Sequence, residues 1–167
     1  MAWTTPRTWV AGEVVTAALM NAQIRDNVNA VWPLGDPTAA WTPFTPALTN
    51  ITIGNGVLTC SYMRTGRWVV ARYSFVWGTT TSASGSQVFA LPVAAHAIYI
   101  VNSHVGSANV LDGAVASYGG YTCTIITGAT NFGLEAAGAG SFVNATVPVA
   151  FGNTDGITAH VVYEAAA

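Results

Sequence analysis

RWVVARYSFVW, residues 67–77, is the longest run of β-forming residues in the chain. Successive side chains of a strand point to opposite faces, so the run divides into two sets. One set is Val69, Ala71, Tyr73, Phe75 and Trp77, and the other is Trp68, Val70, Arg72, Ser74 and Val76. Because both sets are largely apolar, the pattern predicts a strand covered on both faces near the centre of a β-sandwich.

Strand-like segments recur on both sides of this run. They are residues 48–53, 57–63, 87–91, 97–105, 110–118, 121–127, 132–136, 141–150 and 157–163. The turns between them are marked by Gly54-Asn55-Gly56, Arg64-Thr65-Gly66, Asp112-Gly113, Gly119-Gly120 and Asn153-Thr154-Asp155-Gly156. Asn55-Gly56 favours a hairpin, and residues 78–86 are expected to form a polar, flexible loop. The pattern predicts a mainly β fold, an antiparallel β-sandwich of jelly-roll type over residues 48–167.

A single segment, Trp9 to Trp32, has the period of an amphipathic helix. Thr16 suits the N-cap position, and Pro33 ends the helix because it has no N–H to donate. The apolar positions between these limits form one stripe, with Asn27 in its seam: Ala17, Met20, Ile24, Val28 and Val31. A helix over residues 17–31 is about 22 Å long and marginally stable alone. It therefore needs a partner, which is its own β-domain, symmetry-related copies or a different protein.

The segment after the helix is rich in proline. Residues 33–47 contain Pro33, Pro37, Pro43 and Pro46, and such segments are extended and semi-rigid. The chain is therefore expected to have three parts. These are an anchoring segment with the helix at residues 1–32, a linker at 33–47, and the β-sandwich domain at 48–167.

Charged residues make up only 7% of the chain, against about 25% in typical domains, and lysine is absent. With 51% hydrophobic residues and a net charge of −2, an isolated monomer would carry little charge to keep copies apart. The composition favours a subunit that buries much of its exterior in an assembly. The alternative is a small, neutral extracellular domain.

The charge pattern also argues against two classes of partner. The five cations form no basic run, which disfavours nucleic-acid binding: Arg7, Arg25, Arg64, Arg67 and Arg72. A membrane-spanning helix needs about 18 consecutive apolar residues, a run that this chain lacks, so no membrane insertion is expected. The N-terminus has neither the basic nor the apolar region of a secretory signal, so synthesis is expected in a host cytoplasm.

Motifs of hydrolases, metalloenzymes and nucleotide-binding proteins are absent from the sequence. The three histidines are dispersed, and Asp112 and Asp155 stand in Asp-Gly turns, where local hydrogen bonding is their expected role. We therefore expect no catalytic residue, no metal site, no cofactor and no enzymatic activity. Cys60 and Cys123 are expected to be free buried thiols, with a disulfide between neighbouring strands as the alternative.

Candidate protein contacts cluster near the N-terminus. Exposed tryptophans usually mark a partner, and the apolar stripe adds to them. The candidate anchoring residues are Trp3, Arg7, Trp9, Met20, Ile24, Val28, Val31 and Trp32. Arg72 is the only charge in the middle of the central run, so it is a candidate for an ion pair between subunits, the alternative being a solvated arginine.

A motif of the form TW-x-x-GE-x-VTA-x-x-MN-x-x-IRDN occupies the N-terminal segment. It is carried by Thr8, Trp9, Gly12, Glu13, Val15, Thr16, Ala17, Met20, Asn21, Ile24, Arg25, Asp26 and Asn27. Residues 5–32 with this motif resemble a segment of virion structural proteins of tailed bacteriophages, particularly those of actinobacterial hosts. Residues 57–95 resemble the fibre and tip domains of such phages more loosely.

This resemblance implies a virion component, of the kinds labelled capsid decoration protein, head fibre or minor tail protein. The chain lacks a long repetitive shaft, which favours a short, capsid-bound homotrimer. Its expected partners are sister copies and the major capsid protein or a tail protein. The alternative is a receptor- or carbohydrate-binding tip on the tail, which would contact a host surface glycan through polar loops such as residues 78–86.

Overall fold

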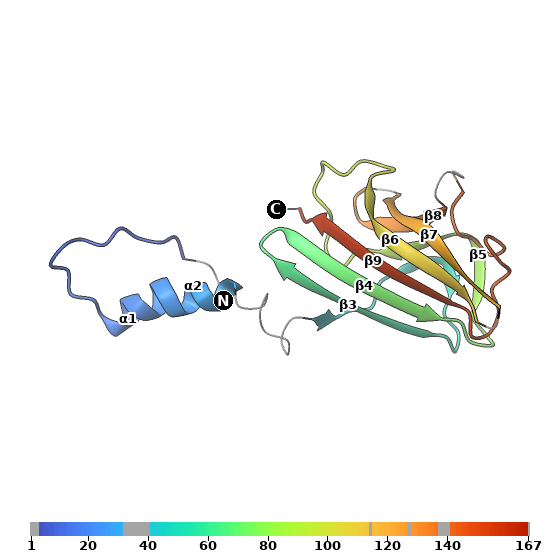
Figure 1. Ribbon diagram of the computed structural model, residues 1–167, viewed down its shortest axis with the longest axis horizontal. Helices are drawn as coiled ribbons and strands as arrows, with labels where there is room; N and C mark the ends of the chain where they lie inside the picture. Colours follow the sequence, from blue (N-terminus) through green and yellow to red (C-terminus); the bar gives the residue numbers. More distant parts are fainter. Residues whose placement is uncertain (1–3, 32–40, 114, 127, 137–140, 167) are drawn as a thin grey trace. The chain divides into compact units, whose positions relative to one another are not determined.

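The computed structural model describes residues 4–31, 41–113, 115–126, 128–136 and 141–166. The chain divides into two compact units, Met1–Ala40 and Trp41–Ala167. The boundary falls inside the proline-rich segment 33–47, of which Pro33 and Pro37 lie outside the described residues. The first unit holds the helix and the second holds the strands (Figure 1).

The helix of the first unit occupies the predicted residues. It is built from α1 (Ala17–Met20), the π-helical turn η1 (Asn21–Arg25) and α2 (Asp26–Val31). The Thr16 side chain accepts a hydrogen bond from the Leu19 N–H at 3.3 Å, which confirms the predicted N-cap. At the end of η1 the N–H of Asp26, its C-cap residue, bonds to the Asn21 carbonyl, which is the five-residue spacing of a π-turn.

The described residues of the second unit form a single antiparallel sheet of nine strands. The strands are β1 (Thr42–Pro43), β2 (Leu48–Thr52), β3 (Val57–Thr65), β4 (Trp68–Val76), β5 (Ser82–Ala90), β6 (His104–Asp112), β7 (Ala116–Ile125), β8 (Asn131–Ala136) and β9 (Gly156–Glu164). They are hydrogen-bonded in the order β1-β3-β4-β9-β6-β7-β8-β5-β2. The predicted mainly β, antiparallel fold is therefore confirmed.

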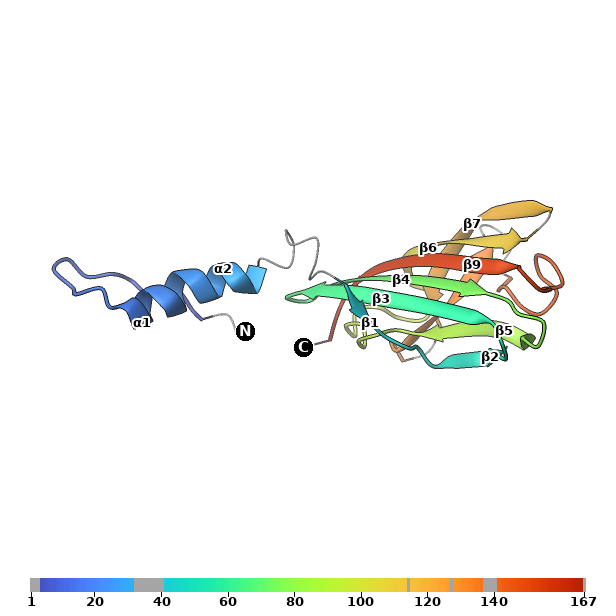
Figure 2. The ribbon, with the colours of Figure 1, turned by 90° about the horizontal axis from the view of Figure 1, so that it is seen from below.

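The sheet curls until its two halves face each other. Figure 2 shows β3, β4, β9 and β6 in one layer and β5 and β2 below it. Tyr73 on β4 packs against Phe89 on β5 and Phe132 on β8, with ring centroids 6.1 and 4.9 Å apart. The Tyr73 hydroxyl also donates to the Ala90 carbonyl at 3.0 Å. The core therefore lies between two layers, as in a sandwich, and the jelly-roll type stays a prediction.

The strand β4 is covered on only one of its two faces. The set that begins at Val69 and ends at Trp77 is buried, as expected. The outward set is not, because Trp68 is 62% and Val76 43% exposed, and Arg72 and Ser74 are exposed as well. The prediction that both faces are covered is wrong, because no strand or helix among the described residues of the second unit packs over the outer side of this layer.

The predicted turn at Asn55-Gly56 exists, but it does not join paired strands. The Gly56 N–H bonds to the Ile53 carbonyl at 2.9 Å, yet β2 pairs with β5 while β3 pairs with β4. The turn therefore carries the chain from one layer to the other. Residues 78–86 are not a flexible loop either, because β5 begins at Ser82 and Asn55 is hydrogen-bonded to Thr79 and Thr80.

Three other strand predictions are wrong. Residues 97–103 form turns, and the strand begins at His104. Gly119 and Gly120 lie inside β7, where the register shift opposite β6 accommodates Gly120 with a φ of +84°. In the segment 141–150 the only described pairing is the Glu135–Phe142 bridge. The two cysteines are both free and buried, as predicted.

Candidate functional site

The extended N-terminal segment is held against the helix by two polar side chains. The Thr4 N–H donates to Asn27 Oδ1 at 2.9 Å, and Asn27 Nδ2 donates to the Thr4 carbonyl at 3.0 Å. One turn earlier, the Arg7 N–H donates to Gln23 Oε1 at 3.0 Å. Asn27 is only 5% exposed. Asn27, which the sequence places in the seam of the apolar stripe, therefore packs within its own unit against the extended segment.

The other motif residues shape the turn that precedes the helix. Gly12 has a φ of +82°, a conformation that favours glycine, and the Glu13 N–H bonds to the Val10 carbonyl. The Glu13 carboxylate accepts from the Val10 N–H at 3.3 Å and pairs with the Arg7 guanidinium at 2.7 Å. The same guanidinium lies 5.2 Å from the centre of the Trp9 ring. Arg7 thus contacts both Glu13 and Trp9 and stabilises this segment.

The predicted stripe is exposed. Met20 is 43%, Ile24 49% and Val28 47% exposed, and Trp9 is 42% exposed. Trp3, Trp32 and the side chain of Val31 lie outside the described residues. The structure therefore brings three of the predicted anchoring residues, Met20, Ile24 and Val28, together on one uncovered helix face.

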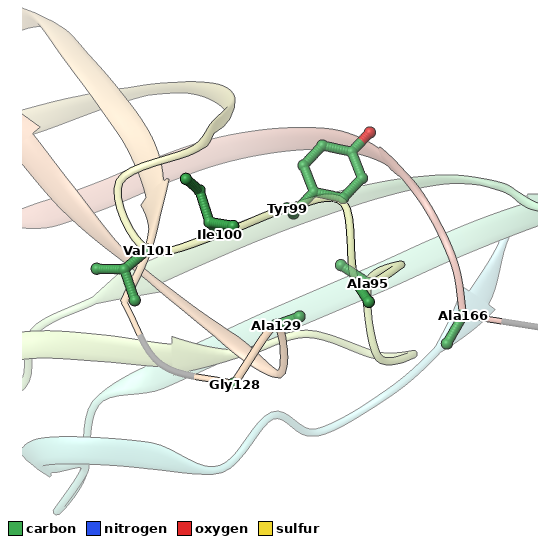
Figure 3. A pocket seen from close by; sticks show the side chains of 8 residues that line it. Ala95, Tyr99, Ile100, Val101, Gly128, Ala129 and Ala166 are labelled. Atoms are coloured by element: carbon green, nitrogen blue, oxygen red, sulfur yellow. The ribbon is translucent and has the colours of Figure 1, made fainter.

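An apolar pocket lies at one end of the β-domain. Its volume is about 530 Å³, and it is lined by Ala95, Ala97, Tyr99, Ile100, Val101, Gly128, Ala129 and Ala166. Figure 3 shows the side chains of Tyr99 and Ile100 on one side and Gly128 and Ala129 on the other. The Tyr99 hydroxyl accepts from the Glu164 N–H at 3.1 Å. The described residues that line the pocket are uncharged and mostly apolar, so the pocket suits an apolar group.

Arg72 lies on the outer face of the layer formed by β3, β4 and β9. Its Nε donates to Ser61 Oγ at 2.7 Å, and its guanidinium carbon is 4.2 Å from the centre of the Trp41 ring. No carboxylate pairs with Arg72 in the part of the chain that the structure describes. A shallow cavity of about 210 Å³ surrounds it, lined by Thr59, Ser61, Arg72, Tyr73, Ser74, Thr158 and His160.

The perturbed ionisable groups lie in the core. Burial raises the pKa of the Cys60 thiol to about 11 and that of Cys123 to about 12. Burial also raises the pKa of Tyr73, and it raises that of Tyr163 to about 12. These groups are held in their neutral forms. None of them is poised to exchange a proton with a substrate near neutral pH.

The carboxylate of Asp155 has a structural role. It accepts hydrogen bonds from the Gly113 N–H at 2.8 Å and from the Gly152 N–H at 2.6 Å, as expected for an aspartate in a turn. Among the described residues, no three His, Cys, Asp or Glu side chains are grouped so that they could hold a metal ion. Within the same residues, no helix is long and apolar enough to cross a membrane.

In comparisons with known proteins, no family model matches this chain, and no curated protein or solved structure matches it.

Sequence reasoning did not predict the pairing of Trp41 with Arg72 or the role of Asn27. Trp41 precedes β1, and β1 pairs with β3 through Thr42 and Tyr62. That pairing brings a residue from the predicted linker beside the outer face of β4. The available signal for this pairing was Trp41 itself, an aromatic residue next to a short edge strand. Its partner Arg72 lies on β4, far along the sequence. For Asn27, the signal was its spacing of four from Gln23.

Proposed function

We propose that this chain is a non-enzymatic virion structural protein of a tailed bacteriophage, attached through its N-terminal unit. The observation that carries the proposal is the uncovered face of Met20, Ile24 and Val28 in a compact unit of its own. Its supporting evidence is the resemblance of residues 5–32 to a phage structural segment. The N-terminal unit, in this proposal, is the attachment device.

The exposed stripe provides a driving force for attachment. Fully burying a valine, isoleucine or methionine side chain stabilises by about 1.5–3 kcal/mol. Since these three residues are about half exposed, covering the rest of each one contributes about 1 kcal/mol. Repetition of the contact around a symmetry axis multiplies the gain, so a trimer holds together through a short stripe.

The β-domain is proposed to face outward from the particle as part of a homotrimeric decoration protein or head fibre. The low charge of the whole chain supports an assembled state. Ile98 and Ile100, beside the apolar pocket, are 70% and 72% exposed. The partner of the N-terminal unit is then the major capsid protein. A tail protein is the alternative partner, which makes the chain a minor tail protein.

The test compares two charge substitutions on one helix. Ile24→Asp places a carboxylate in the stripe, whereas Asn29→Asp places the same charge at an exposed position away from it. The full-length protein is examined by light scattering and by cosedimentation with undecorated capsids and with purified tails. We expect Ile24→Asp to abolish association and Asn29→Asp to preserve it.

Each result decides a separate part of the proposal. Cosedimentation with tails alone assigns the protein to the tail and excludes the capsid role. A wild-type chain that is monomeric and binds neither particle contradicts the proposal, as does association that survives Ile24→Asp.

A further inference from the structure

We propose that the outer face of β3, β4 and β9 binds an acidic saccharide, with the sugar carboxylate held by Arg72. This inference goes beyond the proposed attachment function, because it concerns only the β-domain and does not depend on what the N-terminal unit contacts. It rests on the orientation of Arg72, on the chemistry of the surrounding cavity and on the polar rows of the sheet.

Arg72 is oriented before any ligand arrives. Stacking on Trp41 and the hydrogen bond to Ser61 fix the plane of the guanidinium. The hydrogen bond uses Nε, and the two terminal nitrogens have no hydrogen-bond partner among the described residues. These nitrogens can donate two parallel bonds to one carboxylate, the strongest arrangement open to an arginine. Because the side chain is already ordered, less entropy is lost on binding.

The cavity around Arg72 suits an anion. No aspartate or glutamate lines it, so no internal carboxylate competes for the arginine. His160, the residue directly opposite Arg72 on β9, adds a further hydrogen-bonding side chain. The volume of about 210 Å³ is below the roughly 300–1,000 Å³ of pockets that enclose drug-sized ligands. It therefore suits one sugar unit, with the rest of the ligand lying across the sheet.

Two neighbouring rows of polar residues cross the strands β3, β4, β9 and β6. The register places them opposite one another as Ser61, Arg72, His160 and Ser107, and as Thr59, Ser74, Thr158 and Asn109. Three strand spacings of about 4.8 Å give this polar strip a width of about 14 Å. Its hydroxyl groups both donate and accept, so they match the hydroxyl groups of a sugar.

Apolar residues border the polar strip on both sides. Val57 and Val76 lie on one side, and Val70 and Val162 lie on the other. A sugar ring combines hydroxyl groups with apolar C–H faces, so it matches both parts of this surface. An acidic saccharide supplies, in one ligand, both a carboxylate for Arg72 and hydroxyl groups for the polar rows.

The experiment is a calorimetric titration of the full-length chain with an oligogalacturonate, with the neutral oligogalactose of the same length and with acetate. We expect binding of the acidic oligosaccharide that weakens as salt is added. Arg72→Gln should weaken it by about tenfold or more, since a hydrogen bond to a charged group is lost. Arg67→Gln removes the same charge from an arginine paired with Glu164 at 2.9 Å, and it should leave the affinity unchanged.

Arg72→Lys is the second variant. It keeps the charge and loses the planar fork, so its affinity should fall between those of the wild type and Arg72→Gln. Equal affinity for the neutral oligosaccharide or for acetate overturns the proposal. Binding that is unchanged in Arg72→Gln overturns it as well. So does an absence of saccharide binding together with self-association that Arg72→Gln abolishes, because Arg72 then serves a contact between copies.

Discussion

Asn27 is buried between the helix and the extended segment, where it exchanges two hydrogen bonds with the Thr4 backbone and donates a third to the Gln23 carbonyl at 3.1 Å. We expect Asn27→Ala to release the segment, because the two hydrogen bonds to the exposed Thr4 backbone are lost, each with a net contribution of about 0.5–1.5 kcal/mol. The measurement is hydrogen exchange at the Thr4 and Arg7 amides. Asn29→Ala, at an exposed position on the same helix, is the control and should leave exchange unchanged.

The buried thiols predict how stability depends on pH. The pKa of Cys60 is raised from 9.0 to about 11 and that of Cys123 from 9.0 to about 12. The unfolded chain therefore loses these protons at lower pH than the folded chain. Their contribution is complete below about pH 9 and is lost as pH rises through the folded values, with a slope of up to about 1.4 kcal/mol per unit for each thiol.

Urea unfolding from about pH 8 to about pH 11 measures this slope. Tyr163, whose pKa burial raises from 10.0 to about 12, contributes in the same direction above pH 10. Cys123→Ala should make the decline shallower, although it also lowers stability at every pH by leaving a small cavity. A free energy of unfolding that rises between about pH 9 and 11 would contradict this account.

Among the structural elements, the strands β6 and β9 approach each other closely at Gly106. A β-carbon added to Gly106 would overlap the His160 carbonyl oxygen. We expect Gly106→Ala to lower the free energy of unfolding by about 1–3 kcal/mol, because the two backbones must separate. Gly119→Ala on the adjacent strand β7 is the control, since the nearest atom to its β-carbon is Asn109 Oδ1 at 3.6 Å. Thermal unfolding of the two variants measures the difference.

Elements with a strong local signal were predictable from sequence, and elements defined by distant partners were not. The helix had a cap, a stripe and a terminating proline, and β4 had a long alternating run. Residues 97–103 also look like a strand, but among the described residues only Asn102 and Ser103 form backbone hydrogen bonds to a strand, at Ile125 of β7, and Ile98 and Ile100 remain exposed. Conversely, the serine-rich start of β5 has little strand propensity and is held by pairing with β2.

The same limit applies to the candidate sites. The stripe of Met20, Ile24 and Val28 was predictable because its spacing lies within one helix. The surroundings of Arg72 were not, because Trp41, Ser61 and His160 come from three different segments that only the sheet register brings together. Periodicity shows which face of an element a residue occupies. It does not show what lies opposite.

At the scale of the whole molecule, we expect the N-terminal unit to be required for self-association and the β-domain to determine thermal stability. The β-domain contains the buried apolar core: among the described residues, its fully buried members begin at Cys60, and the partly buried residues packed against them begin at Phe44. Deletion of residues 1–40 should therefore leave the thermal unfolding of the β-domain unchanged and should abolish self-association. Calorimetry and light scattering on the same sample measure the two effects. A deletion variant that melts earlier, or that still forms oligomers, would show that the β-domain depends on the N-terminal unit or assembles by itself.

The position of β9 has a consequence for synthesis on the ribosome. β9 lies between β4 and β6, although residues 156–164 are translated after both of them. Until these residues leave the exit tunnel, β4 and β6 each present an open edge that invites pairing with another nascent chain. The N-terminal unit faces no such delay, because its longest described contact joins residues 23 positions apart. We therefore expect the N-terminal unit to be folded while the β-domain is still incomplete.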